Sequence, residues 1–558
     1  MATIADDHIS ALQTMIYERS DYDTFWTQVR EVAAPDASDF AMPGTLGARS
    51  NLIREASAAR NSKNLYDTTA VNCVDRLASG IEALIVPQSE YWHGYGLSDW
   101  TKEDETDEEK LFLERLRNLT FKLRYDSDTS WVTTIQTCIR RCIAFGNAFM
   151  FLEEGWDRRA FFRYIYLPLP ECYIAENKYH QVDQFKRVYS LTARQAVQKF
   201  GDRVSPSIKK AADDPTRANE RFQFIHCIGP RGDYGMPSSG VRKSPWYSLH
   251  IEFNDRRVVG ESGYFEFPII DFRWMPEPGR VYGEGPIMKC LADIQSLNQL
   301  ARNELIAGNQ AVNPPLLVSD AGVVSRPNTA PGAISYGGLN AQGQRRVDTL
   351  FHGQRLDFAT MVLEAKRNQV KESMYINLFA LLIKNPQMSA TEAMIRANEK
   401  GELLGPAGSR LQQSLSNMNE RELGIIVRKG LLTKPGWEPP RSMTGANVSA
   451  QFTSPLDRYR KGKEVEGTLQ LLNTLAPLAQ VEPTIVDNLD GDEMVRGLAH
   501  RLGMPVKFVR QLPQVQTLRS QRQQQQQMAA TAAIAKDMAA ASKSGVDALS
   551  GMNQMGAA

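Results

Sequence analysis

The chain has 558 residues, of which 42% are hydrophobic and 23% are charged, a composition typical of folded globular proteins and not of disordered or collagen-like ones. Its 65 lysines and arginines nearly balance its 64 aspartates and glutamates, so the formal net charge is +1. This balance excludes histone-like binding of nucleic acid, which needs many unpaired cations, although it allows transient contact with DNA. At about 150 residues per domain, the length predicts several domains and at least one large core.

The N-terminal part of the chain predicts amphipathic helices. Apolar residues recur at helical spacing over residues 4–33 and again over about 57–85, and Pro35 and Pro87 end these two patterns. A further helix is predicted over residues 131–145. The first ten residues are acidic and lack an apolar segment, so we expect no secretory signal, and no run of residues is apolar enough to predict a membrane span.

Two clusters of metal-binding residue types in this region are better explained without a metal. The block 101–110 holds six acids, which predict the solvated start of a helix with Thr106 and Glu109 as a capping box, because nearly consecutive carboxylates cannot all reach one ion. Cys138 and Cys142 lie four residues apart in an apolar stretch without a second ligand pair, which favours a place in the core. The six cysteines form no close pair, which is typical of a reduced intracellular setting.

The middle of the chain predicts a β-rich domain inserted into a helical protein. From residue 148 to residue 192 the apolar pattern changes towards a period of two, and the runs are aromatic and β-branched. A short helix over residues 192–200 follows. Further strands are predicted at residues 222–228, 246–253 and 264–270.

Two long helices separated by a turn-rich segment come next. The first is predicted over residues 286–311, with Pro286 in its first turn, and the second over residues 356–383. The segment between them is rich in proline, glycine and serine with short strand signals, so the pattern indicates a stalk with a small β tip. The first helix spans ~39 Å at 1.5 Å per residue, which is long for a globular helix. One of its faces is lined by Leu291, Ile294, Leu297, Ala301, Leu305 and Gly308.

A third long helical segment is predicted from Ser389, which begins a capping box with Glu392, to Gly430, a C′ glycine. A kink or break is predicted inside it, at Gly401, Gly405, Pro406 and Gly408. Shorter helices are expected over residues 455–512. The remainder, residues 513–558, is rich in glutamine and alanine, which indicates a helix-prone or mobile tail.

Motifs for catalysis are absent from the sequence. It contains no Walker A motif, no nucleophile elbow and no zinc helix. Tyr282-Gly283-Glu284-Gly285 opens a helix, but it lacks the third glycine and the following acid of a dinucleotide site. His226 and Cys227 are adjacent in a predicted strand, so they point to opposite faces and cannot form a dyad. We therefore expect no cofactor, no metal and no enzyme activity.

Three blocks resemble the head-to-tail connecting, or portal, proteins of podovirus-type phages. The first is Asn64-Leu65-Tyr66-Asp67-Thr68-Thr69-Ala70, continued by residues 77–80 and 87–92. The second runs from Arg273-Trp274 to Gly283-Glu284-Gly285-Pro286, followed by residues 291–294 and Leu297-Asn298. The third, residues 388–393, is a softer match. In this order the blocks extend the resemblance over about residues 5–510.

The resemblance implies an α+β, mainly helical portal fold that is assembled as a ring. The implied parts are a wing (1–285, N-terminal helices plus the β-rich part), stem helix 1 (286–311), a clip (312–355), stem helix 2 (356–383), a tunnel loop (384–389), a second wing part with the kinked long helix (390–454), a crown (455–512) and a Gln/Ala-rich tail or barrel (513–558).

The same resemblance implies the function and the partners. A ring, normally a dodecamer, would lie at one capsid vertex of the virion, after assembly in the host bacterial cytoplasm. Double-stranded DNA would pass through it during packaging and ejection, and the expected protein partners are the terminase large subunit, a tail adaptor protein, and capsid and scaffolding proteins, with no membrane involved. The alternative is a DNA-processing enzyme of a phage, such as a nuclease. An ATP-driven motor is disfavoured because the Walker A motif is missing.

The candidate site residues follow from this architecture. We expect stem packing between subunits at Leu291, Ile294, Leu297 and Leu305, and docking of partners at the clip through Val324, Arg326, Arg345 and Arg346. The channel constriction is expected at the tunnel loop, where a proline and an N-cap serine interrupt two helical segments. Its residues are Lys384, Asn385, Pro386, Gln387, Met388 and Ser389.

Overall fold

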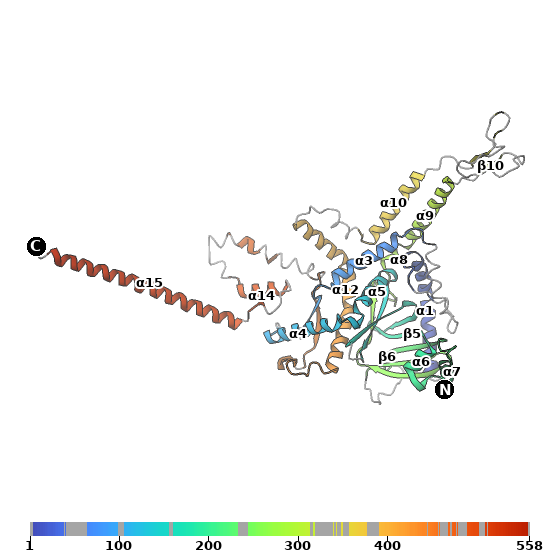
Figure 1. Ribbon diagram of the computed structural model, residues 1–558, viewed down its shortest axis with the longest axis horizontal. Coiled ribbons are helices and arrows are strands. Elements are labelled where there is room, and N and C mark those ends of the chain that lie inside the picture. Colours follow the sequence, from blue (N-terminus) through green and yellow to red (C-terminus); the bar gives the residue numbers. More distant parts are fainter. Residues whose placement is uncertain are drawn as a thin grey trace. The chain divides into compact units, whose positions relative to one another are not determined.

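The fold comes from a computed structural model of the chain (Figure 1). It describes residues 4–37, 40, 64–98, 105–155, 160–232, 244–312, 316–318, 339, 342, 347–349, 356–376, 390–443, 445–455, 457, 467–468, 471–475, 477, 488–501, 508–510 and 512–555. The chain divides into two compact units. The larger comprises residues 1–96, 116–438 and 448–460, and the smaller comprises residues 97–115, 439–447 and 461–558.

The predicted N-terminal helices are present. They are α1 (Ile4–Ala33), α3 (Thr69–Ile85), α4 (Asp107–Arg124) and α5 (Trp131–Phe145). One uninterrupted helix over about residues 57–85 is wrong, because residues 65–68 are not helical and α3 begins only at Thr69; the expected start near residue 57 lies outside the described residues. The capping box before α4 is confirmed, since Glu109 accepts from the Thr106 amide at 2.8 Å and Thr106 Oγ1 accepts from the Glu109 amide at 3.4 Å.

The β-rich region forms two antiparallel sheets within the larger unit. The three-stranded sheet has the order β3-β2-β9, and the five-stranded sheet has the order β4-β5-β6-β7-β8. The strand bounds are β2 (Asn147–Glu154), β3 (Phe162–Leu167), β4 (Cys172–Glu176), β5 (Val182–Thr192), β6 (Arg221–Pro230), β7 (Trp246–Glu252), β8 (Arg257–Tyr264) and β9 (Ile269–Arg273). The single strand expected over residues 264–270 is wrong: β8 ends at Tyr264, β9 begins at Ile269, and Pro268 lies between the two.

Opposite faces of the five-stranded sheet are covered by different helices. Residues of α1 such as Ile9 and Leu12 share a core cluster with Ile225 and Cys227 of β6. The short helices α6 (Ala193–Phe200) and α7 (Pro206–Asp213) share another cluster with Phe224 of β6. Because side chains alternate along a strand, Cys227 lies on the α1 face and the neighbouring His226 does not, as the sequence predicted.

The stalk predicted after the sheets is present but differs in its bounds. The first helix is two helices, α8 (Pro286–Lys289) and α9 (Leu291–Val312), because Cys290 between them leaves the helical conformation at φ −107° and ψ 16°. The second, α10 (Leu356–Ser373), ends ten residues earlier than expected, since Tyr375 adopts a left-handed φ of 56° that a helix cannot continue through. β10 (Leu316–Val318) and β11 (Val347–Thr349) pair antiparallel between α9 and α10.

The long helix α12 (Ala390–Arg428) is continuous, so of the kink or break predicted around Pro406 the break is wrong, and the kink stays a prediction. Its C-terminal half is held by packing, because Leu411, Leu415, Met418, Ile425 and Ile426 are buried. Tertiary contacts of this kind outweigh the local preference of a proline and its neighbouring glycines. The predicted C′ glycine is confirmed, because Gly430 has φ 67° and the helix ends in a Schellman motif with the Gly430 and Leu431 amides bonded to Val427 and Ile426.

The remaining described elements are a two-stranded sheet and two helices of the smaller unit. β1 (His93–Leu97) pairs with β12 (Val448–Phe452). In the smaller unit, α14 (Gly491–Arg501) and α15 (Leu512–Met555) are joined by an ion pair between Arg519 and Asp492 at 2.7 Å. The glutamine- and alanine-rich tail is thus helical over most of its length, one of the two states that its composition allowed.

Candidate functional site at the helical hairpin and its base

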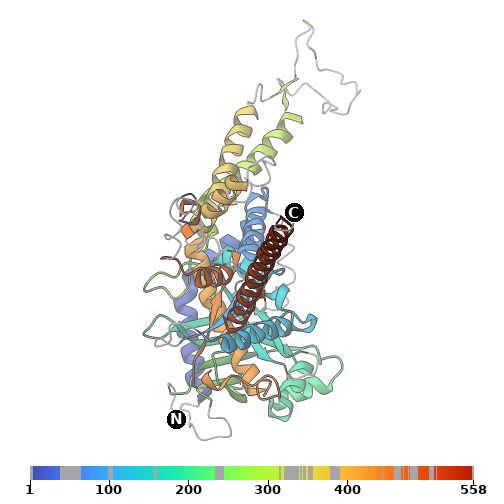
Figure 2. The same cartoon turned by 90° about the vertical axis from the view of Figure 1, so that its left-hand side faces the viewer.

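The helices α9 and α10 lie side by side and form a hairpin that leads to β10 and β11 (Figures 1 and 2). Polar contacts join the two helices along their length. Lys366 Nζ donates to Asp293 Oδ1 at 2.9 Å, and Gln369 Nε2 donates to Asp293 Oδ2 at 3.2 Å. Farther along, Thr360 Oγ1 donates to Glu304 Oε1 at 3.0 Å. These contacts make the hairpin a defined unit, as the stalk interpretation predicted.

The four residues expected to pack between subunits do not share one environment. Leu291, Ile294 and Leu297 are buried in the core of their own chain, with exposed fractions of 4% or less, whereas Leu305 is 56% exposed. The first three therefore do not need a neighbouring subunit to be buried, which corrects the premise of that prediction. Intersubunit packing stays a prediction for Leu305.

Exposed apolar residues gather on the outer half of the hairpin. We call this set the hairpin patch, and its members are between 44% and 80% exposed although all are large and apolar. Single exposed apolar residues are ordinary, but several on one projecting element indicate a contact with another protein surface. The patch consists of Leu305, Ile306 and Val312 of α9 and Met361 of α10.

The base of the hairpin is joined to the N-terminal part of the chain by Asn298. Its Oδ1 accepts from the amides of Tyr66 and Asp67 at 2.7 and 3.2 Å, and its Nδ2 donates to the Asn64 carbonyl at 2.9 Å. One side chain on α9 thus holds three backbone groups of the segment that precedes α3. The first and second resemblance blocks contact each other at this point, although 232 residues separate Tyr66 from Asn298.

Asp67 extends this joint to α10. Its Oδ1 accepts from the Thr69 amide at 2.8 Å at the start of α3, and its Oδ2 accepts from Arg367 Nε at 2.9 Å. Burial acts to raise the pKa of Asp67, but the hydrogen bonds from Thr69 and the charge and hydrogen bond of Arg367 outweigh it, so the pKa lies below its usual range. Asp67 is therefore a buried carboxylate that ties α3 to α10.

A second joint forms where the chain enters α8. Asn147, the first residue of β2, donates from Nδ2 to the Gly283 carbonyl and accepts at Oδ1 from the Gly283 amide, both at 2.9 Å. Gly146, with φ 74°, packs so closely here that a Cβ on it would lie 2.3 Å from the Gly283 oxygen. A Cβ on Gly285 would lie 2.7 Å from the Gly146 nitrogen. These positions need glycine because two backbones touch.

This packing also decides the chemistry of the glycine-rich turn. A phosphate-binding loop needs backbone N–H groups that point at the ligand. Here the Gly283 amide binds Asn147, the Glu284 amide binds the Met275 carbonyl at 3.2 Å, and the Gly285 amide contacts Met288 Sδ at 3.4 Å. The turn is a structural joint, in agreement with the sequence-based rejection of a nucleotide site.

A buried charged network ties α4 to α12. Arg124 binds Glu422 through Nε at 3.0 Å and through Nη2 at 2.5 Å, and both side chains are fully buried. Arg124 also donates to Asn419 Oδ1 at 2.5 Å, and Tyr164 donates its hydroxyl to Glu422. Burial alone would lower the pKa of Arg124, but Glu422 raises it above its usual value.

Histidine and tryptophan rings complete this network. His93 Nε2 lies 2.8 Å from Arg124 Nη1, and burial followed by the charge of Arg124 lowers the pKa of His93 well below its usual value. A neutral His93 can accept from the guanidinium. The Arg124 guanidinium also lies 4.6 Å from the centre of the Trp92 ring and 5.4 Å from that of Trp131. The network is a structural anchor, because every charged group in it has a partner of its own chain.

The remaining predicted site residues lie outside the described residues. This applies to the tunnel-loop residues Lys384, Asn385, Pro386, Gln387, Met388 and Ser389, and to the clip residues Val324, Arg326, Arg345 and Arg346. The sequence reasoning quoted Asp67, Asn298 and Gly283 only as parts of motifs, and it missed Arg367, Arg124 and Glu422. No local signal identifies their roles here, because Arg367 binds Asp67 and Arg124 binds Glu422 across 300 and 298 residues of the sequence.

All six cysteines are buried and unpaired, and Cys138 and Cys142 lie in the main core as predicted. Burial raises the pKa of both thiols. Within the described ranges, no group of three or more histidine, cysteine, aspartate or glutamate side chains could hold a metal ion. A search of the same residues found no helix with the length and apolarity required to cross a membrane.

Comparison with known proteins agrees with the resemblance seen in the sequence. The model of a family described as "Bacteriophage head to tail connecting protein" matches residues 6–509. A "Probable portal protein" of Bordetella phage BPP-1 is 26% identical over 514 residues, which cover 90% of this chain and 88% of that protein. A "Portal protein" of Salmonella phage epsilon15 is 25% identical over 517 residues, again with coverage of 90% and 88%.

Proposed function

The chain belongs to the bacteriophage head-to-tail connecting protein family, and we propose from this that it forms the portal ring at one vertex of a phage capsid, through which DNA is packaged and ejected. The observation that carries this function is the family match over residues 6–509, which spans both joints and the whole hairpin. Two portal proteins are similar to it over nearly their full length. The portal vertex of the virion follows as its location.

The hairpin is our candidate for the part that builds the ring. In a closed ring of identical subunits, each subunit offers two different surfaces to its neighbours. The hairpin patch supports this role, because its apolar side chains are exposed in the single chain and a neighbouring hairpin would cover them. We propose a dodecamer, the number that is normal for the family, with α9 and α10 as its stem.

The two joints explain how the stem is held in one orientation. Asn298 and Asp67 fix the hairpin to the start of α3, and Asn147 fixes the turn before α8 to β2. Side chains with several hydrogen bonds restrict rotation more than single apolar contacts, because each bond has a preferred direction. A ring closes only when every subunit repeats the same angle, so rigid joints at the base of the stem favour closure.

The finer assignments of partners extend this proposal. We propose that the segment between α9 and α10 is the clip, which docks the terminase large subunit and then a tail adaptor, with Val324, Arg326, Arg345 and Arg346 as candidate contacts. The segment 384–389 would face double-stranded DNA in the channel. Capsid and scaffolding proteins would contact the outer part of the ring during assembly in the host bacterial cytoplasm.

The alternative, a DNA-processing enzyme, has no observation in its favour. The amides of the glycine-rich turn are used by the chain itself, and the charged groups of the Arg124 network are paired with one another. Neither feature offers a reacting group to a nucleic acid. The portal is therefore the function that we put forward.

Mass photometry and electron microscopy of the purified full-length protein test this function. The expected result is one closed ring species with an axial hole and a mass of about twelve subunits. A protein that stays monomeric at micromolar concentration and also when capsid assembly partners are supplied would contradict the proposal.

A further inference from the structure

Two histidines lie directly opposite each other on neighbouring strands of the five-stranded sheet, and we call them the histidine pair. They are His226 of β6, which is buried, and His250 of β7, which is half-buried. Their rings stack, with centres 4.1 Å apart and planes 17° apart. Each ring also packs against a phenylalanine. Phe151 of β2 lies edge-on at 6.2 Å from the first ring, and Phe200 of α6 lies 5.2 Å from the second.

A chain of hydrogen bonds runs from α6 to this pair. Lys199 Nζ donates to the Tyr189 hydroxyl at 3.4 Å, and that hydroxyl lies 3.0 Å from His250 Nδ1. A lysine ammonium can only donate, so the Tyr189 hydroxyl accepts from it and has its own proton to give to His250. In this arrangement Nδ1 accepts and carries no proton, which is the neutral form of His250. At the other ring, His226 Nε2 lies 2.9 Å from Ser248 Oγ.

The charged groups that act on the pair are cations. Arg187 of β5 is the register partner of His226, Lys199 lies on α6, and Arg203 lies in the turn after α6. Burial, followed by these three cations, lowers the pKa of His250 to about 3. Burial, followed by His250, Lys199 and Arg187, lowers the pKa of His226 well below its usual value. A proton on either ring would therefore add positive charge where cations already gather.

The acids near the pair are engaged with other groups. Glu171 forms an ion pair with Arg187 at 2.9 Å, and the charge of Glu153 acts on the lysine of α6. Glu252 of β7 holds the start of α7, because it accepts from the amide and the hydroxyl of Ser205 at 3.1 and 2.5 Å. These carboxylates therefore organise the surroundings of the pair and already have partners of their own.

We propose that the histidine pair is an acid-sensitive contact, which holds α6 and α7 on the sheet at neutral pH and releases them as the pH falls. While both rings are neutral, their stacking and the hydrogen bonds from Lys199 and Tyr189 join α6 to β5 and β7. A proton on Nδ1 of His250 removes the acceptor for the Tyr189 hydroxyl, and a proton on either ring adds a charge that the neighbouring cations repel. The apolar cluster that remains between the two helices and the sheet includes Phe200, Ile208, Phe224 and Val259.

The direction and the size of the effect follow from proton linkage. In the released form the histidines bind protons with the ordinary pKa of about 6.5, whereas in the closed form His250 binds one only near its lowered pKa of about 3. The contact is thus at full strength above about pH 7 and weakens as the pH falls. Burial raises the pKa values of the nearby Tyr189 and Tyr264, so these side chains stay neutral throughout. From about pH 7.5 to about pH 5.5, the equilibrium constant for release should rise about tenfold for each histidine that enters water.

Hydrogen–deuterium exchange of the full-length protein, followed by mass spectrometry, tests the release directly. Protection factors, which are corrected for the intrinsic effect of pH on exchange, are compared for peptides of α6 and α7 and for peptides of α5, a helix of the main core. From about pH 7.5 to about pH 5.5, the protection of α6 and α7 should fall by at least about tenfold, and by up to about a hundredfold if both rings enter water. The protection of α5 should change much less. The contact lies within one subunit, so the measurement does not require rings.

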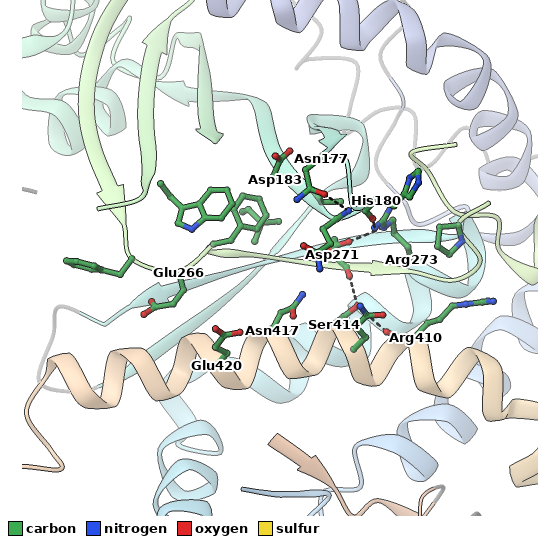
Figure 3. Close-up of a pocket in the computed structure, with 18 residues that line it drawn as sticks. Asn177, His180, Asp183, Glu266, Asp271, Arg273, Arg410, Ser414, Asn417 and Glu420 are labelled. Atoms are coloured by element: carbon green, nitrogen blue, oxygen red, sulfur yellow. Dashed lines mark hydrogen bonds and ion pairs between the residues drawn. The ribbon is translucent and has the colours of Figure 1, made fainter. Parts of the chain in front are cut away.

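Neutral substitutions assign the effect to the pair. In His250→Gln the glutamine can still accept from Tyr189 but does not titrate, so the fall in protection should shrink by about tenfold. In the double variant His226→Gln with His250→Gln it should disappear. His180→Gln is the matched control, and it should behave like the wild type. His180 lies on the turn between β4 and β5, at the groove beside α12 that Figure 3 shows, and its side chain is 72% exposed and pairs with Glu176 at 3.5 Å.

Two results would overturn the inference. One is a wild-type protein in which the protection of α6 and α7 stays constant over this pH range or falls no more than that of α5. The other is a double variant that is folded at neutral pH by circular dichroism and keeps the full pH dependence of the wild type. Should the double variant fail to fold, the wild-type comparison of α6 and α7 with α5 decides alone.

Discussion

Replacing Glu422 by glutamine removes the charge that balances a fully buried arginine. In the wild-type protein Glu422 accepts two hydrogen bonds from Arg124, at 3.0 and 2.5 Å, and one from Tyr164. Glutamine keeps the size and one acceptor oxygen, but it presents an NH₂ group to a guanidinium that cannot accept a hydrogen bond. The variant therefore leaves the Arg124 charge in the core without an opposite charge.

The size of the effect follows from burial. Breaking a buried ion pair by removing one partner costs about 3–5 kcal/mol, because the remaining charge has lost its water and its partner. An exposed pair with a similar separation is a suitable control: Arg217 and Glu220 lie 2.8 Å apart, but their side chains are 54% and 42% exposed. Glu220→Gln should cost less than about 1 kcal/mol.

Urea unfolding followed by tryptophan fluorescence measures the difference, since Trp92 and Trp131 both lie close to the Arg124 guanidinium. Glu422→Gln should lower the unfolding midpoint clearly, and Glu220→Gln should leave it near the wild-type value. The double variant Arg124→Met with Glu422→Met should recover much of the loss, because apolar residues of similar size can replace a buried pair. Equal midpoints for the Glu422 and Glu220 variants would refute the reasoning.

Four further predictions concern ring assembly, the first joint, adaptor docking and the channel. Leu305→Asp should leave the subunit folded, as measured by circular dichroism, but should weaken ring formation, as measured by mass photometry. Leu297→Asp should instead unfold the subunit, because it places a charge in the core. Intact rings with Leu305→Asp would contradict the role of the hairpin patch. The pKa of Asp67 is depressed in the fold, so its stabilisation is present above about pH 4 and is lost as the pH falls. The difference in thermal stability between wild type and Asp67→Asn should therefore shrink below that pH, and a constant difference would be the contrary result. Deleting Val324–Arg345 should leave rings intact and abolish adaptor binding in a pull-down, and retained binding rejects the docking role. Lys384→Glu should leave ring assembly unchanged and alter DNA packaging or retention, and a structure with Lys384 on the outer rim would remove the basis for this expectation.

The secondary structure of this protein follows from its sequence where a pattern is strong and local. The helices α1 and α5 have the predicted bounds, because their apolar residues recur at helical spacing over many turns and a proline or glycine lies just beyond the end. The capping box at Thr106 and the C′ glycine at Gly430 depend only on residues within one turn. Such features need no knowledge of the tertiary fold.

The failures occurred where distant contacts decide the conformation. Pro406 and the glycines near it predicted a kink or break, but α12 is not broken, and its apolar residues are buried on the C-terminal side of the proline. The early end of α10 depends on Tyr375, whose side chain type gives no warning of a left-handed φ. Proline and glycine signals show where a helix can break, and tertiary packing decides whether it does.

The sequence could identify the residues of the two joints only as members of family motifs, and not the contacts that they make. The resemblance blocks marked Asp67, Asn298 and Gly283 as belonging to the family pattern, but spacing along the chain cannot show that Asn298 binds the segment before α3. The expectation that the apolar face of the first stem helix needs a neighbouring subunit to be buried was wrong for a related reason. A long amphipathic helix predicts an apolar face, and it does not say whether the surface that covers this face is in the same chain, as for Leu297, or in another, as we propose for Leu305.

The central claim is that the hairpins of neighbouring subunits pack together to line one ring. A cryo-electron microscopy reconstruction of the purified full-length protein tests it most directly. We expect a closed ring with an axial hole, in which α9 and α10 of each subunit contact the hairpins of both neighbours through Leu305, Ile306, Val312 and Met361. A ring in which these four residues face solvent, or a protein without a ring, would contradict the account.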